Sequence, residues 1–338
     1  IARAAGMTIL LTGGSGFIGS HAAGVLLARG HRIRALVRKS SRLDNLQRFG
    51  SAAIDLVYGD LTDSQGLCAA MEGCRWAVHA AADYRLWARS PHELYNSNVT
   101  GTANLLRAGV SSGVERIVYV SSVGALGLPA DSTPGNERTP VSEADMIGHY
   151  KRSKFLAERK AQEFAQQGAP VVIVNPSTPV GSHDIKPTPT GRIIVDFLNG
   201  RLPAYVDTGL NVVDVADVAA GIANALERGR IGQRYILGNE NITLQYLLKR
   251  LAKLAGRKAP VIRIPYWAAW AAVGLENLVM DRVLRREPAH PFEAVKMAKR
   301  RMFFDSARAV KELDMPQSSV DDALRNAVDW FRANGYAA

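Results

Sequence analysis

The sequence predicts an α/β fold in which a doubly wound parallel sheet carries a smaller α/β lobe toward its C-terminal side. Two observations predict this class. Short runs rich in Val, Ile and Leu alternate with helical stretches through the first half of the chain, which favours parallel strands with helices on both faces of the sheet. A glycine-rich turn also joins the first such run to the first helical stretch, an arrangement that is common in doubly wound sheets.

The first half contains six expected strands and three expected helices. The strands are the apolar runs at 7–12, 31–37, 54–58, 75–79, 116–121 and 170–175. The helices have apolar residues at helical spacing and each ends at a glycine or just before one; they cover 17–29, 93–112 and 149–167.

The second half is less regular. Residues 176–210 hold five of the 15 prolines and are interpreted as loops with one short helix at 191–199. A helix is expected from Asp214 to Leu226, and a strand at 233–237. Thr243 and Ser319 are expected N-caps of helices at 243–255 and 320–334.

These elements divide into two expected units. A dinucleotide-type domain covers 7–175 and 211–238, and a substrate lobe covers 176–210 and 239–338. Residues 1–6 precede Met7 and are interpreted as an artificial or misassigned start.

Composition limits the classes of function. Two cysteines, Cys68 and Cys74, are too few for a disulfide framework or a zinc site, and the seven histidines show no paired metal-ligand spacing, so no metal is expected. No apolar run reaches the roughly 18 to 20 residues that span a bilayer. A reducing, cytoplasmic location is therefore expected.

The net charge of +11 is concentrated in one stretch: residues 241–311 hold 15 Lys and Arg against 5 Asp and Glu. The same stretch contains an uncharged run with three aromatic residues at 264–275. The commoner interpretation is a solvated basic face around an ordinary buried helix. The alternative is that this stretch makes the protein peripheral to an anionic membrane, at the inner face of that membrane. No motif supports nucleic-acid binding.

The turn after the first strand is typical of a Rossmann-type phosphate loop. It reads Thr-Gly-Gly-Ser-Gly-Phe-Ile-Gly from Thr12 to Gly19. Gly13 permits the tight turn, Gly16 lets a pyrophosphate approach the backbone, and Gly19 allows close packing of the helix. The free N–H groups of the helix then face the phosphates, so we expect cofactor contacts from Gly13, Ser15, Gly16, Phe17, Ile18 and Gly19.

The end of the second strand indicates which dinucleotide binds. An NAD site needs an acidic residue there, but the chain has Arg38, Lys39 and Ser40. Because a guanidinium matches a 2′-phosphate, NADP(H) is favoured over NAD(H). Asp60 and Leu61 follow the third strand, near the expected adenine, and the small side chains of Ala80, Ala81 and Ala82 leave room for the cofactor.

Tyr150 and Lys154 form a Tyr-x-x-x-Lys motif on one face of an expected helix. A nearby ammonium and an oxidised nicotinamide lower the pKa of a phenol, which can then exchange a proton at the substrate oxygen while hydride moves at the adjacent carbon. Ser122 ends the fifth strand, where its hydroxyl can bind the same oxygen. We therefore expect Ser122, Tyr150 and Lys154 to be catalytic.

These motifs, with Asn98 to Thr102 and the Val-Asp-Val-Ala-Asp-Val run from Val213, resemble the extended short-chain dehydrogenases/reductases, which include nucleotide-sugar epimerases and dihydroflavonol reductases. The resemblance covers 7–336 and implies the roles given above to Ser122, Tyr150 and Lys154. It also implies pairing into a homodimer through the helices at 93–112 and 149–167. Asn98, Pro176 and Ser177 are further expected cofactor contacts, as are Tyr150 and Lys154 themselves.

A narrower resemblance is to the hopanoid-associated sugar epimerase family, carried by the segments around Tyr84, Tyr150 and 172–211. It implies action on the sugar-derived side chain of a hopanoid lipid. Arg38, and the absence of an arginine before Asn175, depart from true nucleotide-sugar epimerases. By position, the substrate-side candidates are Asp83, Tyr84, Trp87, Val123, Asn175, Ser177 and Thr178.

Three functions remain open at this stage. The first is a nicotinamide-dependent epimerase or reductase that acts on a lipid-linked or free sugar-derived substrate. The second is an NADPH-dependent ketone or aldehyde reductase of the dihydroflavonol-reductase type. The third is a non-catalytic protein that senses NADP(H), against which the complete Ser, Tyr and Lys set argues.

Overall fold

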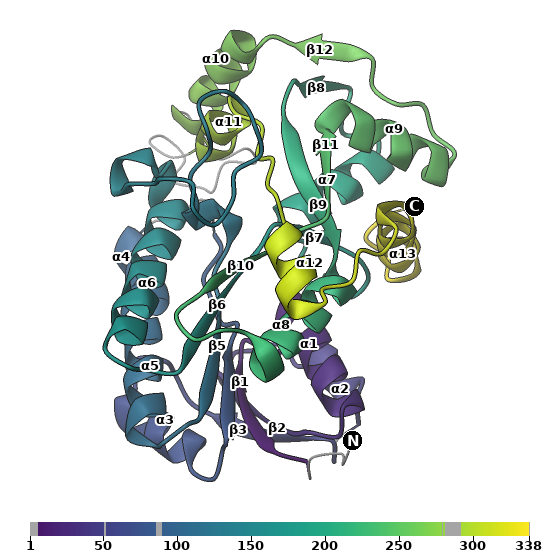
Figure 1. The fold of residues 1–338 in the computed structure, drawn as a ribbon. Coiled ribbons are helices and arrows are strands. Elements are labelled where there is room, and N and C mark those ends of the chain that lie inside the picture. The colour runs from purple at the N-terminus through teal and green to yellow at the C-terminus, as the bar shows by residue number, and fades with distance from the viewer. Residues whose placement is uncertain (1–5, 51, 86–89, 279, 281–291, 338) are drawn as a thin grey trace.

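The computed structural model describes residues 6–50, 52–85, 90–278, 280 and 292–337 (Figure 1). Its largest element is a seven-stranded sheet in the order β10-β6-β5-β4-β1-β2-β3, in which every neighbouring pair is parallel. The strands are β1 Thr8–Thr12, β2 Arg32–Val37, β3 Ile54–Tyr58, β4 Trp76–His79, β5 Arg116–Val120, β6 Val171–Pro176 and β10 Arg234–Leu237. The Rossmann-type α/β fold expected from the sequence is confirmed.

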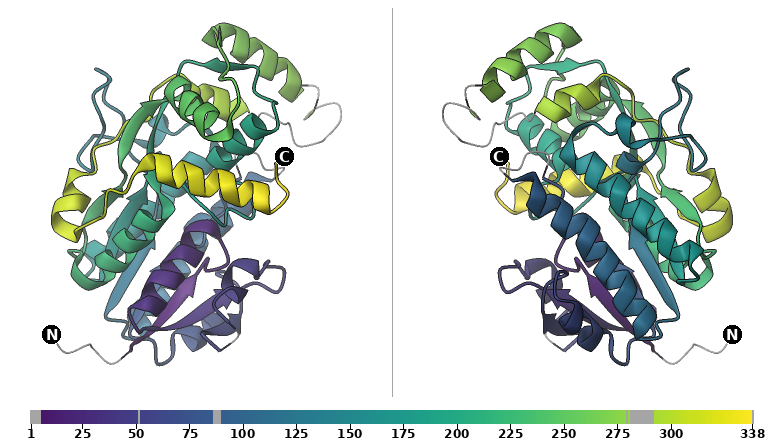
Figure 2. Two further views of the ribbon diagram at one scale, coloured as in Figure 1. Left: turned by 90° about the vertical axis from the view of Figure 1, so that its right-hand side faces the viewer. Right: turned by 90° about the vertical axis from the view of Figure 1, so that its left-hand side faces the viewer.

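Helices cover both faces of this sheet, as Figures 1 and 2 show. One face carries α1 Phe17–Ala28, α2 Asp44–Gln47, α8 Val215–Arg228 and α12 Ala307–Leu313. The other carries α3 Ser64–Met71, α5 Gly101–Ser111 and α6 Gly148–Gln166. The helix expected at 93–112 is three consecutive segments: α4 Pro91–Tyr95, the π-helical η1 Asn96–Thr100, and α5.

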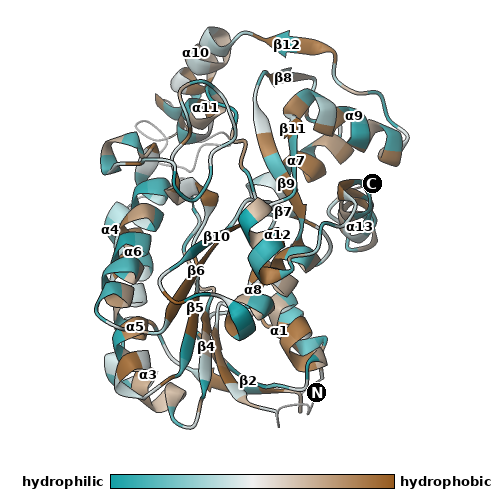
Figure 3. Ribbon diagram, viewed as in Figure 1, coloured by the Kyte–Doolittle hydropathy of each residue, from teal (hydrophilic) through white to brown (hydrophobic). Residues whose placement is uncertain are grey.

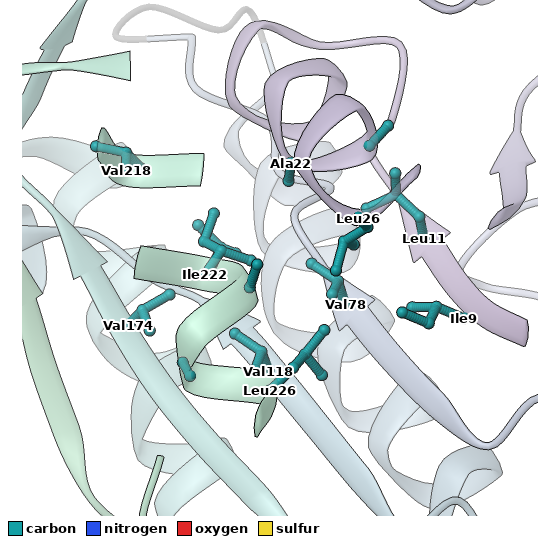
Figure 4. Close-up of a cluster of buried hydrophobic side chains, with 14 of the residues drawn as sticks. Ile9, Leu11, Ala22, Leu26, Val78, Val118, Val174, Val218, Ile222 and Leu226 are labelled. Atoms are coloured by element: carbon teal, nitrogen blue, oxygen red, sulfur yellow. The ribbon is translucent and has the colours of Figure 1, made fainter. Parts of the chain in front are cut away.

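The core between the sheet and the helices α1 and α8 is mainly apolar. Figure 4 shows Ile9, Leu11 and Val78 of the sheet facing Leu26 of α1 and Ile222 of α8. All five are at most 1% exposed. Burial of such side chains contributes roughly 1.5–3 kcal/mol each, which holds the carboxyl ends of the strands in place. Figure 3 shows the same strands as the most hydrophobic part of the fold.

The later segments form a second layer of structure above the sheet. A three-stranded sheet has the order β11-β9-β7, from Glu240–Thr243, Gly209–Asp214 and Thr178–Val180, and β8 Ala204–Val206 pairs with β12 Ile262–Ile264. Around them lie α7 Pro189–Leu198, α9 Leu244–Ala255, α10 Tyr266–Asn277, α11 Phe292–Ala298 and α13 Val320–Ala333.

The sequence interpretation of 176–210 was wrong about its strands: β7, β8 and the start of β9 lie there, besides the expected helix. These strands are short and pair with distant partners, so no local period marks them. The expected domain boundary at 211 falls within β9. Both strands that pair with β9, namely β7 and β11, belong to the unit expected at 176–210 and 239–338. The caps at Thr243 and Ser319 are confirmed, because each side chain accepts a hydrogen bond from the first turn of its helix.

The interpretation of 264–275 as an ordinary buried helix was also wrong. This run forms α10, of which only Ala269 is buried among its described residues. Trp267 is 73% exposed and Leu275 is 64% exposed.

Candidate active site

The glycine loop has the close backbone approaches that a phosphate cradle needs. Gly13 has a φ of 71°, and a Cβ there would lie 2.5 Å from backbone atoms of Ala80 and Ala81. Gly16 is exposed and caps the N-terminus of α1, so the first N–H groups of the helix are open to an anion. A Cβ on Gly19 would lie 2.2 Å from the carbonyl oxygen of Gly13, so this glycine packs the helix onto the loop rather than onto the sheet.

The other residues of the loop make contacts within the protein, through their backbone carbonyls or by packing. Ser15 is half-buried, and its carbonyl accepts a hydrogen bond from Asn45 at 3.4 Å. Phe17 is 9% exposed and its carbonyl accepts from His21, while Ile18 packs against the core. The shape of the loop therefore fits the pyrophosphate of a dinucleotide.

Arg38 lies beyond the end of β2, exposed beside Lys39 and Ser40. Within the part of the chain that the structure describes, its guanidinium has no hydrogen bond or ion pair. The Asp60 carboxylate accepts from the backbone N–H and hydroxyl of Thr62, and these bonds, together with the Arg38 charge, lower the pKa of Asp60 despite its burial. Leu61 is fixed against α5, where its carbonyl accepts from Asn104.

A buried histidine that the motifs did not single out joins the ends of two strands. Nδ1 of His79 lies 2.7 Å from the Thr12 hydroxyl, and Nε2 lies 3.0 Å from the Thr102 hydroxyl. Burial, with a contribution from Lys154, lowers the pKa of His79 to about 3, so the ring is neutral. Only its place at a strand end next to the half-buried Ala80, Ala81 and Ala82 could have marked it in the sequence.

The expected catalytic residues come together at the carboxyl end of β5. Ser122 follows this strand, and its hydroxyl accepts a hydrogen bond from the N–H of Gly124 at 3.0 Å. A hydrogen bond with Ser122 also lowers the pKa of Tyr150, but burial outweighs it and raises that pKa overall. Burial thus outweighs the lowering that the sequence predicted for this pKa, and the phenol is protonated at neutral pH.

Lys154 lies one helical turn beyond Tyr150 and is 2% exposed. Its Nζ donates to the carbonyl of Val120, the last residue of β5, at 3.0 Å. Burial lowers the pKa of Lys154 to about 8, and the Glu158 charge opposes this shift. The ammonium is thereby anchored to the strand that ends at Ser122.

Buried polar side chains support Ser122 and Lys154 from the core side of the sheet end. Asn175 is 0% exposed, and its Nδ2 donates to the Ser122 carbonyl at 3.1 Å and to Glu158 at 2.6 Å. Arg234 pairs with the same carboxylate at 3.1 Å. Asn175 was expected to face the substrate, but the structure places it beneath Ser122, because the last side chains of a central strand point into the core.

Asn98 and its neighbours have a similar internal role. The Asn98 amide donates to the Asp83 carbonyl and to the Ser153 hydroxyl, at 2.8 and 2.9 Å, and accepts from the Asp83 N–H at 2.7 Å. It is 2% exposed, so its amide is used within the protein rather than by a cofactor. Val123 is 4% exposed and Pro176 is also buried, so neither side chain has an exposed surface for a ligand.

The remaining substrate-side candidates lie in the segments that follow β4 and β6. The Asp83 carboxylate pairs with Arg85 at 2.6 Å; burial raises its pKa, but the bonds from Arg85 outweigh this and lower it overall. Tyr84 is exposed and reaches the Lys186 carbonyl at 3.4 Å. Ser177 and Thr178 are half-buried, and the Ser177 hydroxyl is buried without a partner among the described residues. Trp87 lies outside the described residues.

The family model described as "NAD dependent epimerase/dehydratase family" matches residues 9–238, which is more than half of the chain. A putative dihydroflavonol 4-reductase of Synechocystis is 47% identical over 330 residues, covering 96% of this chain and 95% of that protein. Sterol demethylase protein B of Methylococcus capsulatus is 33% identical over 330 residues, covering 97% of this chain and 99% of that protein.

Among solved structures, a nucleoside-diphosphate-sugar epimerase from Pseudomonas aeruginosa has a similar fold, with a TM-score of 0.82 and 31% identity. The match covers 98% of this chain and 99% of that chain. Similarity therefore extends through the second layer of structure as well as through the seven-stranded sheet.

Proposed function

The chain belongs to the NAD-dependent epimerase/dehydratase family and is thus a nicotinamide-dependent enzyme of the extended short-chain dehydrogenase/reductase type, and from this premise we propose its reaction. It transfers hydride at a carbonyl or carbinol carbon of a sugar-derived group, the side chain of a hopanoid lipid, and uses NADP(H). The observation that carries this proposal is the Ser122 and Tyr150 pair at the end of β5, with Lys154 anchored beside it.

The protonation states suit the direction of reduction. When bound, the nicotinamide supplies or accepts the hydride. The protonated Tyr150 then donates its proton to the carbonyl oxygen, while the Ser122 hydroxyl holds that oxygen in line. The Lys154 charge favours the phenolate that remains, and Tyr150 regains a proton from solvent. In the reverse direction the same phenolate removes the proton of a hydroxyl, which an epimerase also needs.

The residues around the expected adenine support NADP(H). The Arg38 guanidinium is exposed and unpaired within the described chain, so binding a 2′-phosphate breaks no existing ion pair. No acidic residue ends β2, where NAD sites place one.

Two likenesses support the substrate class. The segments around Tyr84, Tyr150 and 172–211 resemble the hopanoid-associated sugar epimerase family. The relative from Methylococcus is named for an activity on sterols, which are polycyclic isoprenoids as hopanoids are. We infer a lipid-linked substrate, a cytoplasmic enzyme and a homodimer formed through the outer faces of α5 and α6.

The second candidate is an NADPH-dependent ketone or aldehyde reductase of the dihydroflavonol-reductase type on another substrate. The name of the 47% identical relative favours it. A reductase consumes NADPH in proportion to product, whereas an epimerase retains its nucleotide and shows no net consumption. Following NADPH absorbance with hopanoid sugars and with simple ketones therefore separates the two.

Tyr150→Phe tests the catalytic assignment. Removing the proton donor should reduce kcat by about 10²–10⁴-fold and leave nucleotide affinity unchanged. Tyr246→Phe, at an exposed tyrosine of α9, is the matched control and should retain full activity. An unchanged kcat in Tyr150→Phe would favour a non-catalytic, NADP(H)-sensing role.

Titration with NADPH and NADH tests the cofactor. Arg38→Gln should weaken NADPH binding about tenfold or more, since a charge-assisted bond contributes roughly 1.5–3 kcal/mol. NADH binding should not change. Arg32→Gln, an exposed cation at the opposite end of β2, is the control. Equal loss of both nucleotides in Arg38→Gln would contradict recognition of a 2′-phosphate.

A further inference from the structure

Large apolar side chains gather on one exposed part of the second layer. Twelve are exposed in the described chain, and six of them belong to residues 261–278, here called the apolar tip: Val261, Ile262, Trp267, Trp270, Leu275 and Leu278. The tip consists of β12 and α10, which lie at the end of the molecule remote from the seven-stranded sheet (Figures 1 and 2). Val261 is 85% exposed and Trp267 is 73% exposed. Large apolar side chains that are so exposed, and that cluster together, usually mark a surface that binds a partner or a membrane.

The surroundings of the tip are strongly basic. Exposed cations flank it in the sequence on both sides, at Lys253, Arg257, Lys258, Arg263, Lys296, Lys299, Arg300 and Arg301. Asp207 pairs with Arg263 at 2.8 Å and with Arg301 at 3.2 Å. The other six have no ion pair with a described residue, so the chain segments next to the tip carry a net positive charge.

The tip is joined to the catalytic helix by packing. The rings of Trp270 and Phe292 lie 5.4 Å apart, which connects α10 to α11. The next residue of α11, Glu293, lies against Gly148 at the start of α6, two residues before Tyr150. A surface that binds the tip is thus one helix away from the proton donor.

From these observations we propose that the apolar tip docks on an anionic lipid bilayer. Trp267, Val261 and Ile262 enter the interfacial region, where indole rings and branched side chains are favoured, and the surrounding cations bind lipid phosphates. None of the described helices is long and apolar enough to cross a membrane, so the tip lies on the surface. Docking does not depend on the reaction; only delivery of a lipid substrate to Tyr150 rests on the proposed function.

Co-sedimentation with vesicles tests this proposal on the full chain. Vesicles of phosphatidylcholine with phosphatidylglycerol should bind the protein at low salt, and pure phosphatidylcholine should bind it far less. Binding should weaken at high salt, because screening shortens from about 10 Å at 0.1 M to about 3 Å at 1 M. The double variant Val261→Glu, Trp267→Glu should bind at least about tenfold more weakly, since it removes apolar area and adds repulsion.

A matched control places the same charge outside the tip. Ile231→Glu alters a 49% exposed apolar residue between α8 and β10 and should leave vesicle binding unchanged. All variants should keep the melting temperature and the NADPH affinity of the parent, which shows that they fold. The proposal is overturned if the parent ignores anionic vesicles, or if the double variant binds like the parent. It is also overturned if size-exclusion chromatography shows that the tip instead holds two copies together.

Discussion

Single polar side chains behind the catalytic group are buried, and each is held by at least two hydrogen bonds. His79 joins Thr12 and Thr102, and Asn175 joins Ser122 and Glu158. Because an unpaired buried polar group costs roughly 1–3 kcal/mol, these bonds hold one arrangement of the strand ends. The geometry of Ser122 and Lys154 therefore depends on buried residues behind them as well as on their own contacts.

His79 makes stability depend on pH. Its pKa is about 3 in the folded protein, against 6.5 in the unfolded chain, so below pH 6.5 the unfolded chain binds the extra proton. Its contribution is complete above pH 6.5 and is lost as pH falls toward 3. At pH 5 the loss is about 2 kcal/mol, at about 1.36 kcal/mol per pH unit.

Urea unfolding of the parent and of His79→Gln at pH 7.5 and pH 5.0 measures this loss. Glutamine can bond both threonine hydroxyls but does not titrate, so the free energy of unfolding of the variant should fall less between the two pH values. The same fall in both proteins would mean that other groups, such as His21, govern the acid sensitivity.

At the scale of elements, helix α1 and the strand ends meet through glycine backbones. Gly19 contacts the Gly13 carbonyl, and Gly13 contacts the chain of Ala80 and Ala81. These approaches bring the helix N-terminus and the end of β4 around one space. The phosphate loop is therefore a product of backbone packing as well as of glycine flexibility.

Gly19→Ala should separate α1 from the loop, since its Cβ would lie 2.2 Å from a backbone oxygen that cannot rotate away. We expect the affinity for NADPH to fall at least about tenfold and the free energy of unfolding to fall by about 1–3 kcal/mol. Gly24→Ala in the same helix is the control, because its nearest neighbour is the Phe49 ring at 3.1 Å, a side chain that can shift. Equal nucleotide affinities in the two variants would contradict this account.

At the scale of the whole molecule, the lobe formed by the second layer of structure contacts α6, the helix of Tyr150, at its first residue. Gly148 begins α6 with a φ of 76°, and a Cβ there would lie 2.4 Å from Cγ of Glu293 in α11. Lys151 Nζ, one turn further, lies 3.8 Å from the sulfur of Met302. The position of the lobe over Tyr150 is thus set by a few close contacts.

Gly148→Ala should push α11 away from α6 and raise KM about tenfold, with little change in NADPH affinity. The matched variant is Gly148→Ala, Glu293→Ala, which removes the clash but keeps the strain of about 1–2 kcal/mol from the positive φ. KM should return toward that of the parent. Steady-state kinetics in which the second substitution gives no recovery would assign the defect to backbone strain alone.

Local spacing was enough to predict the parts of this protein that depend on neighbours in sequence: the six strands of the first half, the helices α1 and α6, the caps at Thr243 and Ser319, and the glycine loop. It did not predict α2 and α3, nor the division of the helix expected at 93–112 into three segments. The motifs also predicted Ser122, Tyr150 and Lys154 as a catalytic group, and the fold brings these three residues to one strand end. Only the tertiary structure decided that Asn175 supports Ser122 from below, that His79 bridges two strands and that α10 is exposed. The short strands of the second layer also needed it. Burial and strand pairing depend on residues far apart in sequence, so a local pattern carries no record of them.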